Sequence, residues 1–339
     1  MVSWRNEDKQ RDIVISSRVR LARNIKNMPF PVLLPEKRAM LVVESVESCL
    51  MNQKTLTTEF KKIMIGKIDA GEKKMLVEKH LTSPELGKHW GASVFISENE
   101  DVSIMVNEED HVRIQCIKEG FQLQEAYNTA NKVDDVLEEC VEFAYHQKYG
   151  YLTSCPTNAG TGMRASVMLH LPTLTLNNQI GTMTMTLAKF GLTIRGIYGE
   201  GSQALGDLYQ VSNQNTMGVT EQEIINTLHD VAKEIIKKER DIRYEILHNN
   251  RIFLEDKIFR AYGILTNART MDPEESLKLL SLVRLGSDLE LIDQDISIIN
   301  RLMSDIQPGI LAKTYKIGIE DADRDRIRAQ HIRNQLIMD

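Results

Sequence analysis

Five arginines stand beside predicted strand ends and polar turns, where they could bind phosphate. The segment Ser16-Ser17-Arg18-Val19-Arg20 places two guanidinium groups two residues apart, which in an extended chain puts both on one face. The others are Arg113, Arg164 and Arg195. A guanidinium binds phosphate oxygens in a bidentate fork and keeps its charge at any working pH. Each arginine alone fits a solvated or salt-bridged residue, whereas the set fits a triphosphate site built without a P-loop.

Acids and one thiol accompany these arginines. Asn107–His111 (NEEDH) is polar and follows a β-branched run, which suits a hairpin turn. Cys155 opens the glycine-containing segment Cys155–Thr161. Taken alone, the turn fits a simple acidic hairpin and the cysteine fits a buried structural thiol.

Several common nucleotide-binding and metal-binding signatures are absent from the sequence. It has no GxxxxGK[ST], HRD, DFG or HExxH. Residues 199–204 (GEGSQA) match GxGxxA after a predicted strand, but a dinucleotide site needs a helix opening there, and the following ALGDLYQVSN favours another strand. We therefore expect a glycine loop at this position.

The composition is that of an ordinary soluble globular protein. Among the 339 residues, 42% are hydrophobic and 27% charged, and the net charge of −6 argues against general nucleic-acid binding. No apolar run approaches the roughly 18 residues of a membrane span, and the polar N-terminus lacks a signal peptide's apolar segment. The four cysteines form no CxxC pair, which favours free thiols and a cytoplasmic location over disulfides or a zinc site.

The pattern of apolar residues predicts an α+β fold, with an antiparallel sheet flanked by helices and then a smaller all-helical domain. Thr220 and Glu223 form a capping box that starts a long helix, and beyond about residue 245 apolar residues recur at helical spacing. The other expected elements are helices over 36–62 and 123–147 and strands over Ala92–Ser97, Val102–Val106, Val112–Ile117, Leu192–Tyr198 and Leu208–Val211.

Four separated segments together resemble the catalytic core of the phosphagen kinases, also called guanidino kinases. They are SSRVRLARN (16–24), VNEEDHVRI (106–114), CPTNAGTGMRASV (155–167) and RGIYGE (195–200), in the family's order. The resemblance covers residues 12 to about 245. It implies a catalytic domain over 1–245, with ATP and Mg²⁺ as cofactors, and leaves 246–339 as the helical domain.

The resemblance also implies roles for individual residues. Glu109 and Glu200 would clamp the substrate guanidinium, Cys155 would lie against it as a thiolate, and Glu108 would help to position hydrated Mg²⁺ without a direct protein ligand to the metal. The nucleotide would be held by Ser16, Ser17, Arg18, Val19, Arg20, His80, Arg113, Arg164, Ala165, Ser166, Val167, Met168, Arg195, Gly196, Ile197, Tyr198, Gly199 and Glu200. Tyr198 departs from the small-molecule members and could reshape the substrate mouth.

Phosphorylation of a guanidinium group requires carboxylates and fixed cations in the site. An arginine side chain is a poor nucleophile because its lone pairs are delocalised and its pKa exceeds about 12. Two carboxylates can hold the planar fork in line with the γ-phosphate, and one can accept the departing proton. Fixed cations then stabilise the charge on the transferred phosphoryl group.

The position of the arginine pair favours a protein substrate. Small-molecule members carry a helical domain of about a hundred residues before it, whereas here the pair begins at residue 18. We therefore expect an open guanidinium pocket, as the resemblance to bacterial protein-arginine kinases implies. Two alternatives stay open: a kinase of free arginine or another small guanidino compound, and a non-catalytic adaptor that binds phosphoarginine.

The C-terminal region supports the protein-arginine kinase subtype. Residues Arg324, Asp325, Arg326, Ile327, Arg328 and Ala329 resemble the RDxxRA motif, which in those kinases belongs to an allosteric phosphoarginine-binding pocket. On spacing alone, the motif fits a solvated face of a charged helix better than an anion site, and the family context reverses this preference. The apolar spacing of this helical region exceeds what a lone hairpin of helices needs, which favours a homodimer. The resemblance further implies a stress-response role, a zinc-binding activator protein, a Clp unfoldase and protease, and a heat-shock repressor as target.

Overall fold

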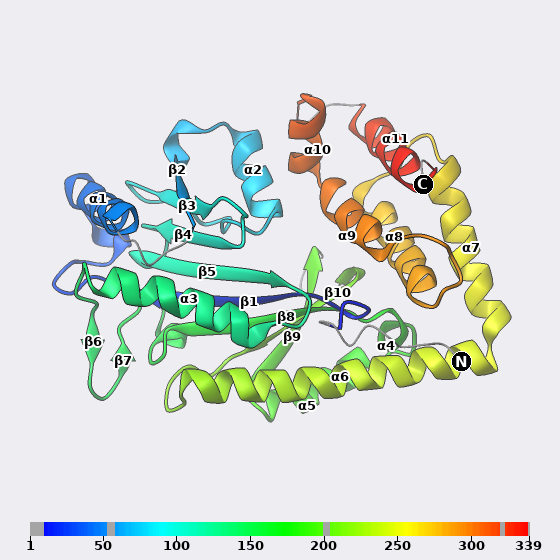
Figure 1. Cartoon of the computed structure of the whole chain (residues 1–339), viewed down its shortest axis with the longest axis horizontal. Coiled ribbons are helices and arrows are strands. Elements are labelled where there is room, and N and C mark those ends of the chain that lie inside the picture. Colours follow the sequence, from blue (N-terminus) through cyan, green and yellow to red (C-terminus); the bar gives the residue numbers. More distant parts are fainter. Residues whose placement is uncertain (1–9, 53–57, 199–203, 319–322, 338–339) are drawn as a thin grey trace.

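The computed structural model describes residues 10–52, 58–198, 204–318 and 323–337 (Figure 1). Its centre is an eight-stranded sheet in the order β2-β3-β4-β5-β1-β8-β10-β9, in which every neighbouring pair is antiparallel. The strands are β1 (Val14–Arg23), β2 (Phe60–Met64), β3 (Ser93–Ser97), β4 (Val102–Val106), β5 (Val112–Glu119), β8 (Met163–His170), β9 (Leu192–Tyr198) and β10 (Ala204–Asn213), beside a small ribbon of β6 (Tyr145–His146) and β7 (Gly150–Tyr151).

The helices fall into those that cover the sheet and those that form a separate bundle. The first group is α1 (Glu36–Asn52), α2 (Ala70–Glu78), α3 (Leu123–Glu138), α4 (Pro172–Leu176), α5 (Ile180–Ala188) and α6 (Glu221–Asn249). The second is α7 (Arg251–Asn267), α8 (Pro273–Asp288), α9 (Ile296–Asp305), α10 (Pro308–Tyr315) and α11 (Arg324–Ile337). Short 3₁₀ turns are η1 (Pro31–Leu33), η2 (Ile65–Lys67) and η3 (Pro156–Asn158). No helix within these described ranges is both long and apolar enough to cross a membrane.

The two faces of the sheet differ in character because side chains alternate along each strand. Val19 and Leu21 of β1 join Val167 of β8 in the main apolar core, which α1, α3 and α6 cover. Burying these aliphatic side chains stabilises the fold by roughly 1.5–3 kcal/mol each. The opposite face carries Arg18 and Arg20, so the alternation of β1 separates the core from the candidate site.

The long helix α6 starts as the sequence predicts. The Thr220 side chain accepts a hydrogen bond from the Glu223 backbone N–H (3.2 Å), and the Glu223 carboxylate accepts one from the Thr220 N–H (2.8 Å). The helix continues through residue 245 without a break, so the change of composition seen there does not mark a linker. A second apolar cluster, built from α7, α8, α9 and α11, also takes in Leu208 of β10.

Two predicted helices are too long. Residues 60–62, placed in a helix over 36–62, belong instead to strand β2, which pairs with β3. The helix predicted over 123–147 ends at Glu138, and Tyr145–His146 belongs to β6. In both cases strand pairing decides the structure: β2 pairs with β3, about thirty residues further along the chain, and β6 pairs with the nearby β7. The expected strand after residues 199–203 is confirmed, since β10 runs antiparallel to β9 and no helix opens at Ala204.

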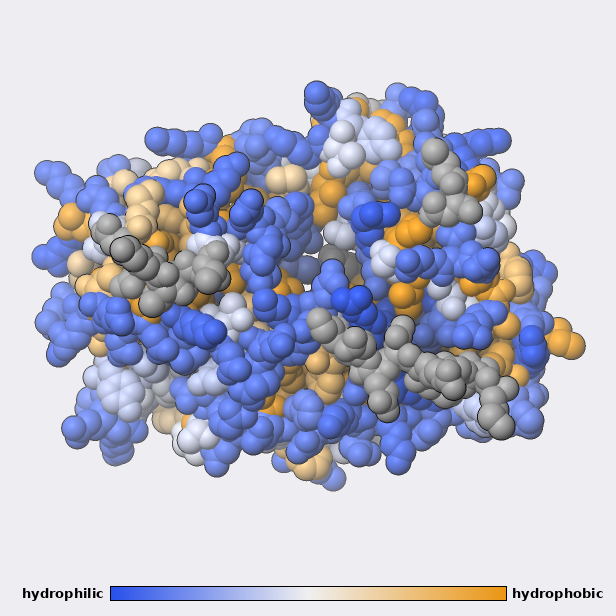
Figure 2. Space-filling model, viewed as in Figure 1, coloured by the Kyte–Doolittle hydropathy of each residue, from blue (hydrophilic) through white to orange (hydrophobic). Residues whose placement is uncertain are grey.

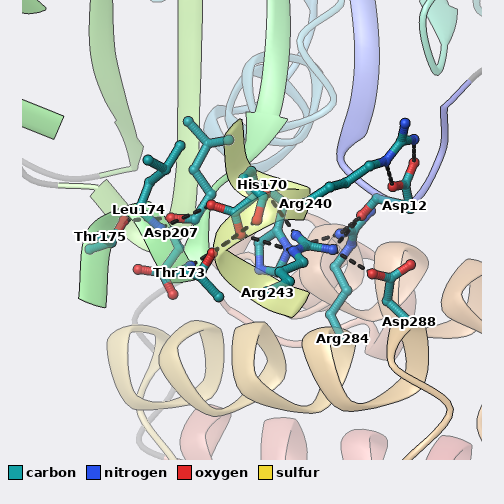
Figure 3. A network of polar contacts seen from close by, with 12 residues as sticks. Asp12, His170, Thr173, Leu174, Thr175, Asp207, Arg240, Arg243, Arg284 and Asp288 are labelled. Atoms are coloured by element: carbon teal, nitrogen blue, oxygen red, sulfur yellow. Dashed lines mark hydrogen bonds and ion pairs between the residues drawn. The ribbon is translucent and has the colours of Figure 1, made fainter. Parts of the chain in front are cut away.

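A buried polar network joins the sheet to the helical bundle (Figure 3). Arg243 and Arg284 are fully buried. Arg243 pairs with Glu239 (2.9 Å) and with Asp288. Arg284 donates to Nδ1 of His170 at the end of β8 (2.8 Å), and burial together with these two arginines holds the pKa of His170 well below its ordinary value. The imidazole is therefore neutral and can accept this bond.

Candidate active site

All five predicted arginines lie on one face of the sheet, which we call the arginine face (Arg18, Arg20, Arg113, Arg164 and Arg195). Side chains of directly paired residues on neighbouring strands share a face. Arg20 is paired with Arg164 of β8, and Arg18 with Ser166. Ala22 is paired with Arg113 of β5, and Gln210 of β10 with both Met168 and Arg195. Arg195 lies inside β9 rather than at its end, where the sequence placed it.

The arginine face is electrostatically unfavourable without an anion. Burial, followed by Arg164 and Arg113, lowers the pKa of Arg18 to about 10. Burial and the neighbouring arginines also lower the pKa of Arg20. Like charges placed directly opposite on neighbouring strands destabilise a sheet. A polyanion such as a triphosphate would relieve this repulsion.

Most of these guanidinium groups have no carboxylate partner within the described residues. Only Arg113 forms ion pairs there, with Glu108 (2.6 Å) and Glu109 (3.1 Å). Arg18 donates to the neutral Oε1 of Gln210 at 3.0 Å. The Nε of Arg20 is buried and has no hydrogen-bond partner in the same ranges. Such donors are costly unless a ligand satisfies them.

The acidic turn at 107–111 is held by buried side chains that the sequence did not single out. Asp110 accepts hydrogen bonds from Asn24 Nδ2 and from the Ser154 backbone N–H, both at 2.7 Å. Asn24 also accepts from the His111 N–H (2.9 Å), and Ser154 Oγ donates to the Glu109 carbonyl (2.6 Å). The end of β1, the acidic turn and the loop before Cys155 therefore form one rigid unit.

The thiol loop is shaped by close backbone approaches. Cys155 is partly exposed, and its Sγ lies 3.0 Å from Thr157 Oγ1. Gly160 has φ +106°, and a Cβ there would lie 2.2 Å from the Thr216 carbonyl oxygen, so only glycine fits. The thiol also lies close enough to Arg164 for its charge to oppose the lowering of that guanidinium's pKa. The loop thus brings Cys155 to the same end of the arginine face as the acidic turn.

The two glutamates of this turn have different environments. Glu108 is buried, accepts a hydrogen bond from Ser83 Oγ (2.6 Å) and pairs with Arg113. The side chain of Glu109 is 43% exposed. Burial is the main cause of a raised pKa at Glu109, and Arg113 opposes it. Glu108 therefore positions Arg113, whereas Glu109 faces the site opening.

His80 lies next to the arginine face, far from the motif segments in sequence. It adopts a left-handed backbone (φ 59°), and its carbonyl accepts a hydrogen bond from Gln115 Nε2 at 2.7 Å. Burial, and then Arg18, lower the pKa of His80 to about 4, so the ring is neutral at neutral pH. Ser16, Ser166 and Met168 share this face through their pairings.

Other residues of the predicted nucleotide set lie elsewhere. The side chains of Ser17, Val19, Ala165 and Val167 point to the opposite face and are buried in or beside the core, so they position strands rather than present side chains to a ligand. Gly196 and Ile197 belong to β9 beside Arg195. Glu200 and Gly199 lie outside the described residues, as does the side chain of Tyr198.

The RDxxRA motif opens α11, with Arg324 and Arg328 one turn apart. Arg328 is fully buried and donates to the carbonyls of Ile306 (3.0 Å) and Met271 (2.9 Å) and to Asp325. Its Nη2 has no hydrogen-bond partner within the described chain. Arg326 is exposed and pairs with Asp323 (3.1 Å). Arg328 thus braces α8, α9 and α11, and this geometry differs from a wholly solvated helix face.

Fold and site together define an ATP-dependent phosphotransferase that acts on guanidino groups. Residues 41–242 match the ATP:guanido phosphotransferase C-terminal catalytic domain. The fold is that of solved guanidino kinases: a lombricine kinase is 22% identical (TM-score 0.62, covering 69% of this chain and 68% of that one). The duplicated taurocyamine kinase of Schistosoma mansoni, bound to transition-state analogue components, is also 22% identical (TM-score 0.61, covering 75% of this chain and 38% of that one).

The chain belongs to the protein-arginine kinase family. Residues 251–339 match the protein-arginine kinase McsB C-terminal domain. A protein-arginine kinase of Caldanaerobacter subterraneus subsp. tengcongensis is 46% identical over 328 residues, covering 96% of this chain and 97% of that protein. The protein-arginine kinase of Bacillus subtilis (strain 168) is 45% identical over 338 residues, covering 98% and 93%.

Proposed function

We propose that this chain transfers the γ-phosphoryl group of ATP to arginine side chains of proteins. The observation that carries the proposal is the layout of β1. Its arginines line one face, and its far end is fixed to the turn of Glu109 and the loop of Cys155. A triphosphate lying along the arginine face would point its terminal phosphorus at these two groups.

The proposed chemistry assigns each group one task. A guanidinium nitrogen of the substrate attacks the γ-phosphorus, the bond from that phosphorus to the bridging oxygen of ADP breaks, and Glu109 takes the proton released by the nitrogen. Glu200 would be the second carboxylate of the clamp, and Cys155 would lie against the guanidinium. The arginine face holds the charge that spreads over the moving phosphoryl group.

Mg²⁺ would be bound chiefly through the phosphates of the nucleotide. Mg²⁺ commonly keeps several waters and uses phosphate oxygens with one or two carboxylates. Glu108 would take part through water, and the ion would neutralise charge on the phosphates.

We expect the phosphorylation rate to fall as the pH falls through the raised pKa of Glu109. The base form of a carboxylate with a raised pKa is lost at a higher pH than that of an ordinary glutamate. Initial rates of ADP release between pH 5 and 8 would measure this acid limb. Glu109→Gln should be nearly inactive and lack the limb, whereas Glu274→Gln, on the surface of α8, should keep it. A limb that persists in residual Glu109→Gln activity would show that another group is the base.

The main test uses radiolabelled ATP with a basic protein. The label should be transferred and then lost in acid, because phosphoarginine is acid-labile whereas phosphoserine persists. Efficient turnover of free arginine would favour the small-molecule alternative. Unchanged transfer by Glu200→Ala would contradict the proposed clamp, and absence of any transfer would favour the adaptor.

A protein substrate is supported by exposure at the reacting end of the site. Glu109 and Cys155 are both partly exposed, and Arg195 is exposed. A guanidinium on a protein surface could therefore reach this end without a closing domain. The similar proteins of Caldanaerobacter subterraneus and Bacillus subtilis are protein-arginine kinases, which supports the same substrate class.

Regulation and partners are proposed on family resemblance. The turn of α11 that carries Arg324–Ala329 would bind phosphoarginine and adjust activity. A zinc-binding activator protein, a Clp unfoldase and protease, and a heat-shock repressor would be partners in a cytoplasmic stress response; the four free cysteines fit a reducing compartment. Binding of a phosphoarginine peptide that Arg324→Ala abolishes would test the pocket.

We further propose that residues 246–339 form the dimerisation unit. Ile252, Phe259 and Ile264 of α7 are exposed large apolar side chains, and Figure 2 shows hydrophobic residues at the surface along the edge formed by α7. Contiguous exposed apolar surface commonly marks an interface. A solution mass of one chain at micromolar concentration would contradict this proposal. In this proposed division, residues 1–245 form the catalytic unit.

A further inference from the structure

A cleft of about 1220 Å³ lies between the arginine-bearing side of the sheet and the helical bundle. Ser16 and Met168 of the sheet and His80 line one side, whereas Asn300 and Arg301 of α9 line the other. Figure 2 shows the surface hollowed between these two parts. The volume is somewhat above the range of about 300–1,000 Å³ typical of small-molecule sites.

The cleft continues the arginine face at the end opposite to Glu109. Along β1, Ser16 lines the cleft, Arg18 and Arg20 follow on the same face, and Ala22 is paired with Arg113 beside the acidic turn. Six residues of extended strand span about 20 Å. A nucleotide whose terminal phosphate reaches Glu109 must therefore place its nucleoside end toward the cleft.

We infer that α9 of the helical bundle forms the outer wall of the nucleoside site and that Arg301 contacts the purine. This inference rests on the proposed use of ATP. Ile117 and Met168 give the inner wall an apolar surface, and Leu208 and Met303 line the cleft beside them. Such a surface suits a purine ring, and the guanidinium of Arg301 can stack on that ring or donate to its nitrogens.

Arg301 differs from the other cations that line the cleft. Arg11, Lys79 and Arg240 are paired with Glu119, Glu100 and Asp12 respectively. Arg301 is exposed and forms no ion pair with any residue that the structure describes. A cation that lines a cleft without a partner remains available to a ligand.

One rim of the cleft is fixed by the buried network of Figure 3. Arg284 donates to Oδ1 of Asn300 (2.7 Å), to the Asp12 carbonyl (2.8 Å) and to His170 (2.8 Å). A single buried guanidinium thus ties the outer wall to the segment before β1 and to the end of β8. The spacing of the two walls is therefore set before any ligand arrives.

The other rim is closed by a contact between α2 and α10. Glu78 caps the N-terminus of α10 by accepting from the Gly309 N–H (2.7 Å) and the Ile310 N–H (2.9 Å). A Cβ at Gly309 would lie 2.8 Å from the Met75 nitrogen, so α2 and α10 pack too closely there for any residue with a side chain. His80, which lines the cleft, follows α2 directly. The contact of α10 with α2 therefore fixes this side of the cleft as well.

Calorimetric titration with Mg-ATP and with tripolyphosphate, which lacks a nucleoside, tests the inference. We expect Arg301→Ala to weaken ATP binding about tenfold and to leave tripolyphosphate binding unchanged. Ser297→Trp, which would fill the cleft from the exposed start of α9, should weaken ATP still more. Arg260→Ala, an exposed arginine of α7 paired with Asp256, is the matched control and should bind both probes as the parent does.

The outcomes separate this inference from the proposed function. If the parent binds ATP and transfers phosphate but both cleft variants match it, the outer wall makes no contact and the inference is wrong. Equal weakening of ATP and tripolyphosphate by Arg301→Ala would place this residue at the phosphates and also overturn it. If the parent binds neither probe and transfers nothing, the proposed function itself fails.

Discussion

Replacing Arg20 with methionine should lower kcat/KM for phosphoryl transfer by about 10²–10³ without lowering stability. Arg20 lies at the middle of the arginine face, opposite Arg164, and its Nε has no hydrogen-bond partner in the described chain. Its nearest charges are mainly cations, which together with burial lower its pKa. Removing it would therefore remove a proposed phosphate ligand and relieve repulsion at the same time.

Initial rates of ADP release and urea unfolding of the same preparations would test this pair of effects. Arg251→Met is the control, because Arg251 is exposed on α7 and paired with Glu255. The control should match the parent in both measurements. A parallel loss of activity and of unfolding free energy in Arg20→Met would assign Arg20 a structural role and contradict the phosphate site.

Replacing Arg243 with methionine should destabilise the protein by about 3–5 kcal/mol. The guanidinium is fully buried between Glu239 and Asp288, and burial already raises the pKa of Asp288. Without Arg243 both carboxylates would stay buried without their cation. Removing one member of a buried ion pair costs far more than the pair itself contributes.

The free energy of unfolding in urea measures this loss. Arg260→Met, which breaks an exposed pair one helix away, should change it by no more than about 1 kcal/mol. Adding Asp288→Asn to Arg243→Met should recover part of the loss, because one uncompensated charge is removed. A single variant as stable as the parent would show that the network of Figure 3 does not hold the bundle to the sheet.

The sequence predicted the elements whose signal is local. The capping box at Thr220 and the alternation of Arg18 and Arg20 in β1 both depend on neighbouring residues, and the structure shows both. The helix over 36–62 was predicted too long because β2 forms only by pairing with β3, thirty residues away in the chain. Local patterns carry no information about such a partner.

The candidate site divides in the same way. The arginines and Glu109 could be named from motifs, and pairing places all five arginines on one face. The support behind them could not be read from spacing, because Asn24, Asp110 and Ser154 meet only after three distant segments fold together. Asp110 and His111 belong to the quoted motif NEEDH, but the sequence did not indicate that they hold the turn in place. No sequence motif pointed to Arg301.

The central position of β1 has a consequence for how the chain is made. Among the strands that the structure describes, β1 comes earliest in the chain, yet its partners are β5 and β8. At about 5–20 residues per second, roughly 5–20 s pass between its emergence and that of β5, about 90 residues later. During that time β1, which is apolar on one face only, remains without its strand partners. Slow codons between these strands would lengthen the wait and should lower the yield of folded chain, even though the mature protein is unchanged.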